Sequence, residues 1–212
     1  MKGNLIIISS PSGGGKGTLI REVLQSVPEI GYSVSFCTRE RRFGEEDGRD
    51  YHFISVAEFE EKISEGEFLE YAEVHGNYYG TSLIETERKL NAGLDVILEI
   101  DVQGALQVMK KVPGAAISIF IMPPSFDVLK ARLTSRNTES PENLALRLTN
   151  AHGEVEQFTR FDYVIVNDEV HVAARKLAAI ILSERQRQVR QSDRIKAIME
   201  SFVQVNQTNT GE

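Results

Sequence analysis

A glycine-rich stretch near the start of the chain has the composition of a phosphate-binding loop. The letters SSPSGGGKGTL begin at Ser9 and follow the apolar run of residues 5–8. Glycines let successive backbone N–H groups approach phosphate oxygens closely, and a lysine adds a positive charge. The spacing departs twice from G-x-x-x-x-G-K-[ST]: Ser10 replaces the first glycine and Gly17 replaces the hydroxyl residue. The predicted phosphate contacts are Ser12, Gly13, Gly14, Gly15, Lys16, Gly17 and Thr18.

The residue after the lysine decides how such a loop treats a metal ion. In strict phosphate loops a hydroxyl at this position ligates Mg²⁺, whereas here the nearest hydroxyl belongs to Thr18. The G-K-G-T form is similar to that of nucleoside monophosphate kinases, which hold the metal largely through water and substrate oxygens. The alternative is a flexible glycine linker that opens a helix. The strand pattern before the loop and the helix pattern after it favour the phosphate loop.

Two carboxylates follow the apolar run in the letters VILEID. Glu99 and Asp101 are two residues apart, so on a strand they would point to the same face at its carboxyl end. In a parallel sheet that end lies beside the phosphate loop, where both groups could orient Lys16 and the water around Mg²⁺. The alternative is a polar strand end that meets solvent. The letters DVQG also fit the D-x-x-G of GTPases, but the chain has no N-K-x-D motif, so we treat that match as chance.

A group of basic residues stands out in a chain whose formal net charge is −7. Arg39, Arg41 and Arg42 lie close together, with the phenol of Tyr51 a few residues on. Guanidinium groups and a phenol suit one compact dianion. The alternative is a solvated basic turn paired with the acidic residues Glu45, Glu46 and Asp47.

The elements that must position these residues alternate between strands and helices. Apolar runs at residues 5–8, 96–100, 115–121 and 163–166 predict strands that are buried on both faces. Helical periodicity covers residues 18–27, 83–91, 102–111, 126–135, 142–158 and 170–187. This alternation predicts an α/β fold with a parallel sheet. Residues 33–81 break the pattern and are predicted to form an inserted lobe with short strands. The core then comprises residues 1–32 and 82–212, with a lid at about 132–147.

Composition limits the classes of function. The negative net charge disfavours nucleic acid as a partner. The single cysteine fits a reducing compartment, no stretch approaches membrane-spanning length, and the four histidines lack metal-ligand spacing. A cytoplasmic protein is therefore expected. Near the end of the chain, apolar residues recur at helical spacing and either pack on the domain or form a contact between subunits in a homo-oligomer: Ile195, Ile198, Met199 and Phe202.

Several long motifs together resemble guanylate kinase over residues 3–184. They are SPSGGGKGT, SVSxxTRxxRxGExxGxDYxF, EFLEYAEVHGNYYGTS, LEIDVQG, PPSxxxLxxRLxxRxTES and VIVND, in this order along the chain. The resemblance implies a P-loop core with a GMP-binding lobe and a helical lid. It also implies transfer of the γ-phosphoryl group from ATP to GMP with Mg²⁺.

The resemblance assigns roles to individual residues. It implies that Arg39, Arg42, Tyr51 and Tyr79 hold the phosphate of GMP, and that Glu70, Ser35 and Thr81 bind guanine, with Asp101 also on the GMP side. A carboxylate at Glu70 would accept the adjacent N1–H and N2–H₂ donors of guanine, which adenine cannot match. The implied catalytic residues are Lys16, Arg132, Arg136 and Arg147. Asn167 lies near the adenine of ATP, and Glu99 is the implied metal-positioning residue, through water.

Two departures from the family pattern affect these assignments. The family usually has aspartate at the position of Glu99 and glycine at the position of Asn137 in the lid. The longer Glu99 side chain moves the carboxylate outward, whereas asparagine tolerates left-handed backbone angles. Two other functions remain as alternatives: a guanylate-kinase-like domain that binds protein partners without catalysis, and a monophosphate kinase for another base.

Overall fold

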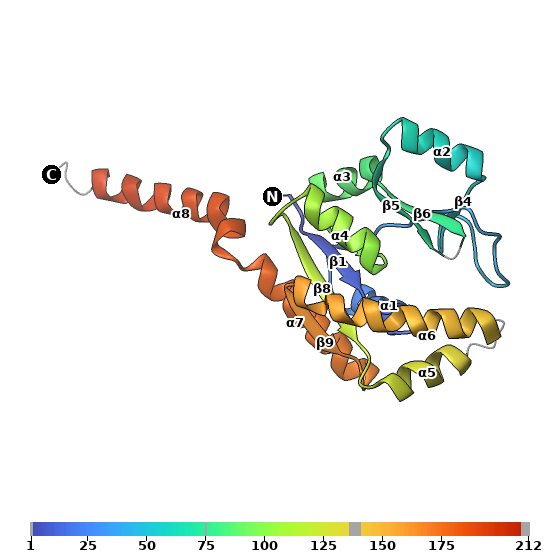
Figure 1. Cartoon of the computed structure of the whole chain (residues 1–212). Coiled ribbons are helices and arrows are strands. Elements are labelled where there is room, and N and C mark those ends of the chain that lie inside the picture. The colour runs from blue at the N-terminus through green and yellow to red at the C-terminus, as the bar shows by residue number, and fades with distance from the viewer. Residues whose placement is uncertain (1, 75, 136–140, 209–212) are drawn as a thin grey trace.

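The computed structural model describes residues 2–74, 76–135 and 141–208 of the chain. Its centre is a parallel sheet of five strands in the order β2-β7-β1-β8-β9. The strands are β1 (Leu5–Ser9), β2 (Ile30–Tyr32), β7 (Asp95–Glu99), β8 (Ala116–Met122) and β9 (Tyr163–Val166). The first strand therefore lies in the middle of the sheet, and the loop that follows it begins at the centre of the carboxyl edge (Figure 1).

Both faces of this sheet are covered by helices, which explains the continuous apolar runs. Ile6 and Ile8 of β1 point to the face that carries α1 (Lys16–Ser26) and α7 (Val170–Arg185). Leu5 and Ile7 point to the opposite face, which carries α3 (Leu83–Asn91) and α4 (Val102–Lys111). Neighbouring residues of the strand thus enter different hydrophobic clusters, and these two clusters fix the sheet beneath the loop.

A second, four-stranded sheet has the order β4-β3-β6-β5. Its strands are β3 (Phe36–Cys37), β4 (His52–Phe53), β5 (Phe68–Val74) and β6 (Asn77–Ser82). The helix α2 (Val56–Ser64) lies over this sheet (Figure 1) and buries Phe59, whose ring stacks on Phe68 at 4.5 Å and on Tyr78 at 5.3 Å. A capping box of Ser55 and Glu58 starts this helix.

Two further helices form an arm on the other side of the central sheet. They are α5 (Phe126–Ser135) and α6 (Pro141–Glu156), followed by a 3₁₀ turn η1 (Gln157–Arg160). Leu129 and Leu133 of α5 pack against Ala151 of α6 in a small separate cluster. The predicted lid at about 132–147 falls on this arm. The last helix, α8 (Gln188–Thr208), extends away from the body of the molecule (Figure 1).

The predicted α/β class with a parallel sheet is confirmed, and so are the four predicted core strands. The helices α3, α4 and α5 begin and end at the predicted residues. Two elements were missed, β2 at the sheet edge and α2 in the segment where only short strands were expected. The division into a core (1–32 and 82–212) and a lobe (33–81) remains a proposal, which is supported by the separation of the strands into two sheets.

Candidate active site

A cavity of about 270 Å³ opens where the carboxyl edge of the central sheet faces the second sheet. Four parts of the chain line it: the glycine-rich loop, the second sheet with the segments that adjoin its strands, the end of β7 with the two residues that follow it, and α6. Sites in open α/β sheets form at this edge because the loops after parallel strands converge there.

The loop has the backbone that a phosphate cradle requires. Gly13 has φ 84° and Gly15 has φ 90°, both in the left-handed region that disfavours other residues. Gly15 caps α1, so the first N–H groups of that helix face the cavity. Lys16 Nζ donates a hydrogen bond to Ser10 Oγ at 3.0 Å, and the N–H of Ser12 donates to Glu154 Oε2 at 3.0 Å.

A buried polar cluster lies behind the loop. Asn167 Nδ2 donates to the carbonyl of Gly14 at 2.9 Å, and Arg132 Nη2 donates to the carbonyl of Asn167 at 2.9 Å. The Nη1 of Arg132 and the Oδ1 of Asn167 are buried, and neither has a hydrogen-bond partner in the described part of the chain. Buried polar groups of this kind normally have partners. The cluster therefore offers one unused donor and one unused acceptor next to the loop.

The carboxylate of Glu99 lies against the start of α1. Glu99 pairs in register with Ile8 at the carboxyl end of the sheet, and its Oε2 accepts a hydrogen bond from Tyr32 Oη at 3.2 Å. Its Oε1 would lie 3.4 Å from a Cβ placed on Gly17. Burial raises the pKa of Tyr32 far above its usual value, with Glu99 adding to the effect, so this phenol stays protonated and donates.

The predicted group of Arg39, Tyr51 and Tyr79 is assembled in the second sheet. The Arg39 guanidinium lies 4.9 Å from the centre of the Tyr51 ring, and the Tyr51 and Tyr79 rings are 5.9 Å apart. Burial raises the pKa of Tyr51 to about 12. Burial also raises the pKa of Tyr79, so both phenols keep the proton that a phosphate oxygen would accept as a hydrogen bond.

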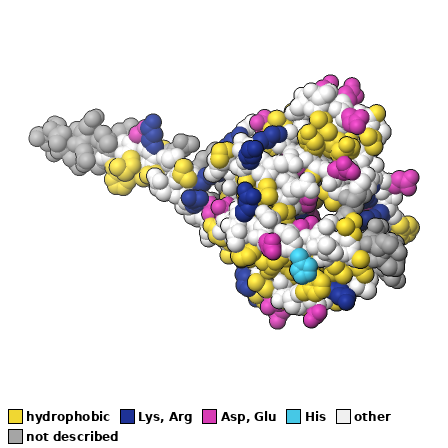
Figure 2. Space-filling view, viewed as in Figure 1, with side chains coloured by type: hydrophobic (Ala, Val, Ile, Leu, Met, Phe, Trp, Pro, Cys, Tyr) yellow, Lys and Arg dark blue, Asp and Glu magenta, His cyan; other side chains and the backbone are white. Residues whose placement is uncertain are grey.

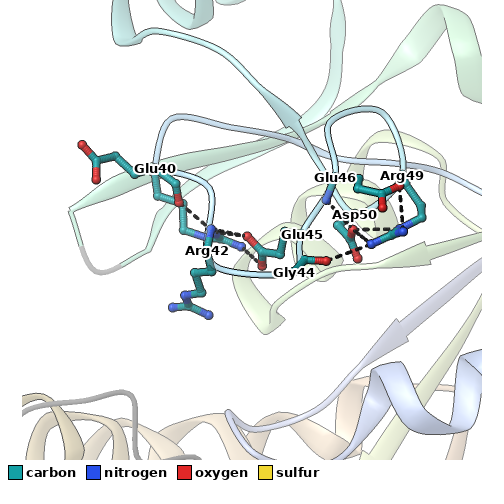
Figure 3. A network of polar contacts seen from close by, with 8 residues as sticks. Glu40, Arg42, Gly44, Glu45, Glu46, Arg49 and Asp50 are labelled. Atoms are coloured by element: carbon teal, nitrogen blue, oxygen red, sulfur yellow. Dashed lines mark hydrogen bonds and ion pairs between the residues drawn. The ribbon is translucent and has the colours of Figure 1, made fainter.

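Part of the alternative interpretation, in which this basic segment pairs with neighbouring acidic residues, is also present in the structure. Arg39 forms two hydrogen bonds to Glu45, at 2.6 and 2.7 Å, and this ion pair raises the pKa of Arg39 and lowers that of Glu45. The side chain of Arg42 points away from this network (Figure 3) and lines the cavity. Arg49 pairs with Glu46 and Asp50 further along the segment (Figure 3). Arg39 is thus held in place by Glu45, whereas Arg42 faces the cavity.

Glu70 of β5 is a buried carboxyl group at the inner end of the cavity. Its side chain is 4% exposed, and its Oε1 accepts a hydrogen bond from Thr81 Oγ1 at 2.6 Å. Burial raises its pKa to about 7, with the charge of Asp101 adding to the effect and the Thr81 hydrogen bond opposing it. A carboxyl group with a pKa this far above its usual value in a cavity is typical of a binding or catalytic position.

The predicted pair of carboxylates on one strand was wrong for Asp101. The strand β7 ends at Glu99, and Asp101 is the N-cap of α4, where its side chain accepts from the N–H of Gly104 at 2.8 Å. Both carboxylates still line the cavity. Within the described ranges, the side-chain hydrogen bond of Lys16 goes to Ser10 and to neither carboxylate.

Most of the predicted site residues meet in this one cavity. Those that line it are Ser12, Gly13, Gly14, Gly15, Lys16, Gly17, Ser35, Arg39, Arg42, Tyr51, Glu70, Tyr79, Glu99, Asp101 and Arg147. Thr81 and Asn167 lie outside the lining and donate hydrogen bonds to the lining residues Glu70 and Gly14. Arg132 donates to the carbonyl of Asn167 and so lies one residue further away. Thr18 is exposed and is not part of the lining. Arg136 and Asn137 lie outside the described residues.

Comparison with known proteins gives a consistent result. A family model described as guanylate kinase matches residues 2–184. The chain belongs to the guanylate kinase family. It is 47% identical to a guanylate kinase of Aromatoleum aromaticum over 194 residues, covering 92% of this chain and 95% of the relative. It is 50% identical to a guanylate kinase of Psychrobacter arcticus, covering 92% and 93%.

A solved structure extends this likeness to three dimensions. The crystal structure of guanylate kinase from Anaplasma phagocytophilum has a TM-score of 0.76 and 35% sequence identity, and the match covers 89% of each chain. The guanylate kinase family and its α/β fold, both expected from the sequence, are therefore confirmed.

The sequence analysis missed several residues at the guanylate kinase site. Ser10 was noted only as a replacement for the first glycine, yet its hydroxyl accepts a hydrogen bond from Lys16. Tyr32 and Glu154 were not identified, because nothing in the local pattern shows that they reach Glu99 and Ser12 from distant elements. For α2, the S-x-x-E capping box at residues 55–58 was a signal that could have revealed the helix.

Proposed function

We propose that this member of the guanylate kinase family transfers the γ-phosphoryl group of ATP to GMP, giving ADP and GDP. One observation carries the proposal: the phosphate loop and the arginine–tyrosine group of the second sheet line the same cavity. Each group suits a phosphate, and two phosphates held across one cavity can approach in line for direct transfer.

The loop and the cluster behind it bind the donor nucleotide. Backbone N–H groups of residues 12–18 and the ammonium of Lys16 hold the phosphates of ATP. The unpaired Nη1 of Arg132 gains a phosphate oxygen as acceptor, and the unpaired Oδ1 of Asn167 suits the amino group of adenine. The carboxylate of Glu154 must leave the N–H of Ser12 when phosphate arrives, because both are negatively charged acceptors.

The second sheet binds the acceptor nucleotide. Arg39 and Arg42 neutralise the phosphate of GMP, with the phenols of Tyr51 and Tyr79 as further donors. Glu45 keeps Arg39 oriented while leaving part of its guanidinium free, since the arginine has five N–H donors. This arrangement lowers the repulsion between the two nucleotides before transfer.

Guanine is read by its pattern of donors and acceptors. The ionised Glu70 accepts N1–H and N2–H₂, while hydroxyls of Ser35 and Thr81 serve the remaining positions, with Asp101 on the same side. Adenine would place its N1 lone pair against the Glu70 carboxylate, and this mismatch costs about 1–3 kcal/mol or more.

Transfer itself needs no general base from the protein. The acceptor is already a phosphate oxyanion, so positioning and charge stabilisation carry the rate. Arg132 and Arg147 approach the transferring group from the arm formed by α5 and α6, and the proposed Arg136 lies outside the described residues. Closure of the arm excludes water, which would otherwise hydrolyse ATP.

Magnesium belongs to this proposal as the metal of the donor nucleotide. The residues present fit it, because Glu99 places a carboxylate oxygen beside the loop, 3.4 Å from where a Cβ on Gly17 would lie. Among the described residues no cluster of three or more potential ligands could hold a metal alone, which fits an ion coordinated mainly by phosphate and water. When bound, the ion neutralises developing charge on the phosphate oxygens.

The catalytic reading is favoured over a domain that only binds protein partners. The phosphate-loop lysine and the arginines of the arm are present, and Lys16 and Arg147 line the cavity.

No helix in the described ranges has the length and apolar content needed to span a bilayer. We also propose a cytoplasmic location, supported by the single, unpaired and buried Cys37, and no nucleic acid partner, supported by the negative net charge.

A coupled assay of ADP release tests the proposal. The protein with ATP and Mg²⁺ is expected to release ADP with GMP and far more slowly with AMP, CMP or UMP. Glu70→Gln should lower the GMP-to-AMP ratio of kcat/KM by about tenfold or more, because the amide cannot accept both guanine donors. Glu73→Gln, exposed on the same strand, is the matched control. An unchanged ratio in Glu70→Gln would remove this residue from the base site.

The lysine of the loop gives a second test in the same assay. Lys16→Ala should lower kcat at least about a hundredfold, since it removes a preorganised charge at the transferring group, while calorimetric GMP binding stays nearly unchanged. Lys176→Ala, exposed on α7, controls for charge loss. Normal turnover of Lys16→Ala would refute the loop assignment, and ADP release that ignores GMP would refute the kinase proposal.

A further inference from the structure

Gly17 in the phosphate loop and Glu99 at the end of β7 differ in side-chain length from the residues that are common in P-loop proteins. Position 17 carries glycine where strict phosphate loops carry a serine or threonine, whose hydroxyl ligates the metal. Position 99, at the end of the neighbouring strand, carries glutamate, one methylene longer than the aspartate that accompanies that hydroxyl in P-loop proteins. Position 17 thus lacks a side chain, whereas the side chain at position 99 is longer than usual.

The structure brings these two positions into contact. A Cβ on Gly17 would lie 3.4 Å from Glu99 Oε1 and 3.6 Å from Oε2. The hydroxyl of a serine at position 17 would lie one bond beyond that Cβ. The carboxylate of Glu99 therefore lies in van der Waals contact with position 17, next to the place where a hydroxyl of that residue would lie.

Two further observations define the orientation of this carboxylate. Tyr32 Oη holds Oε2 from the side of β2 at 3.2 Å. For Oε1, the atom nearer to position 17, the described ranges contain no hydrogen-bond partner. Thr18, the nearest residue with a hydroxyl, is exposed and outside the cavity lining. A free oxygen thus faces the loop, and the hydroxyl of Thr18 does not replace it.

We propose that Gly17 and Glu99 form a compensated pair, in which Glu99 Oε1 supplies the oxygen at the nucleotide-bound Mg²⁺ that a hydroxyl at position 17 supplies in strict phosphate loops. Tyr32 is a positioning residue that aims this oxygen. The inference rests on the proposed function, because the metal arrives with ATP or ADP. It predicts that Glu99 can be shortened to aspartate without loss of metal binding only when position 17 gains a hydroxyl.

The test is a set of matched variants with a binding readout. The dissociation constant of ADP is measured by calorimetry with Mg²⁺ and with EDTA. The constant in EDTA divided by the constant in Mg²⁺ reports how much the metal strengthens binding, without any turnover. Glu99→Asp should reduce this ratio by roughly tenfold or more, as is typical when a metal-orienting group is lost. Adding Gly17→Ser to Glu99→Asp should restore the ratio, because a hydroxyl oxygen is then present beside the position of the longer carboxylate.

Two controls separate chemistry from packing. Gly17→Ala combined with Glu99→Asp fills the same space without an oxygen and should not restore the ratio. Tyr32→Phe keeps the ring but removes the donor, so it should lower the ratio while GMP binding stays unchanged. Since Gly17 has no left-handed backbone angle, serine and alanine are compatible with the fold.

The outcomes distinguish a failure of the proposed function from a failure of the Gly17–Glu99 pair. A wild-type protein that does not bind ADP, or binds it without any effect of Mg²⁺, overturns the proposed function itself. If the wild type shows the metal effect, then an unchanged ratio in Glu99→Asp, or restoration by alanine as well as serine, overturns the pair alone. A ratio that falls in Glu99→Asp and is not restored by Gly17→Ser also overturns the pair. A ratio that is restored by Gly17→Ser but not by Gly17→Ala supports it.

Discussion

Glu70 is a buried carboxyl group, and burial of such a group affects the stability of the fold. Its carboxyl group is 4% exposed, accepts a hydrogen bond from Thr81 and lies near the charge of Asp101. A buried carboxylate costs stability unless donors surround it. The two adjacent N–H donors of guanine would offset this cost on binding, which fits the proposed role of Glu70.

The raised pKa of Glu70 predicts a particular pH dependence of stability. Its ordinary value is 4.5 and the folded value is about 7, so between these pH values the native state holds a proton that the unfolded state has released. This group therefore destabilises the fold increasingly as the pH rises through that window, up to roughly 3 kcal/mol above it. Glu70→Gln does not titrate and should gain stability relative to the wild type over the same window.

Urea unfolding of both proteins at pH 5, 6, 7 and 8 measures this difference. The exposed Glu73→Gln should follow the wild type at every pH. Parallel curves for Glu70→Gln and the wild type would mean that Glu70 is ionised throughout, contrary to the burial argument.

At the scale of elements, the first turn of α4 is packed directly against the Glu70 side chain of β5. A Cβ on Gly104 would lie only 2.5 Å from Glu70 Oε2 and 3.2 Å from Asp101 Oδ1. The absence of a side chain at position 104 is therefore what allows helix and carboxylate to meet. The N-cap Asp101 holds the same turn through the N–H of Gly104.

This contact predicts a selective effect of Gly104→Ala. The new methyl group should push the Glu70 carboxylate aside and weaken GMP binding by about 10- to 100-fold, the range for losing hydrogen bonds to a charged group. Binding of ADP with Mg²⁺ should stay the same, because the loop lies on a different element. Gly153→Ala on α6 is the control, since nothing lies within 4 Å of its Cβ. Equal loss of GMP and ADP binding would indicate a general defect of the fold.

At the scale of the whole molecule, α8 is the element that does not join the body. Ile195, Ile198, Met199 and Phe202 are exposed by 43–65%, and Figure 2 shows hydrophobic side chains on the projecting part of this helix. Of the two alternatives for these residues, packing on the domain is therefore wrong. Contact between subunits remains a proposal, supported by an apolar stripe that has no cover in the described chain.

Sedimentation velocity over a range of concentrations tests this proposal. The wild type should show a mass above the 23.7 kDa of one chain, and the double variant Ile198→Ser with Phe202→Ser should sediment as a monomer. Its free energy of unfolding at low concentration should change by no more than about 0.5 kcal/mol, as expected for surface positions. A wild type that stays monomeric at every concentration would exclude self-association through α8.

Much of the architecture could be predicted because its signals are local. Apolar runs, helical periodicity and the glycine pattern depend on neighbouring residues, so the order of strands and helices and the position of the loop followed from them. The edge strand β2 was missed because it has only three residues. The helix α2 is as long as α3, which was predicted, so its local signals were present and were overlooked in the segment assigned to short strands.

The sequence by itself determined which groups the chain carries, and it predicted their chemistry: a cradle for phosphate, guanidinium groups for a second phosphate and a carboxylate for a base. Only the tertiary structure decided how these groups meet. It placed Glu99 against Gly17, held Arg39 with Glu45 and removed Glu70 from water. Contacts and burial of this kind join segments that are distant along the chain, and their energies depend on packing and desolvation, which exist only once the chain has folded.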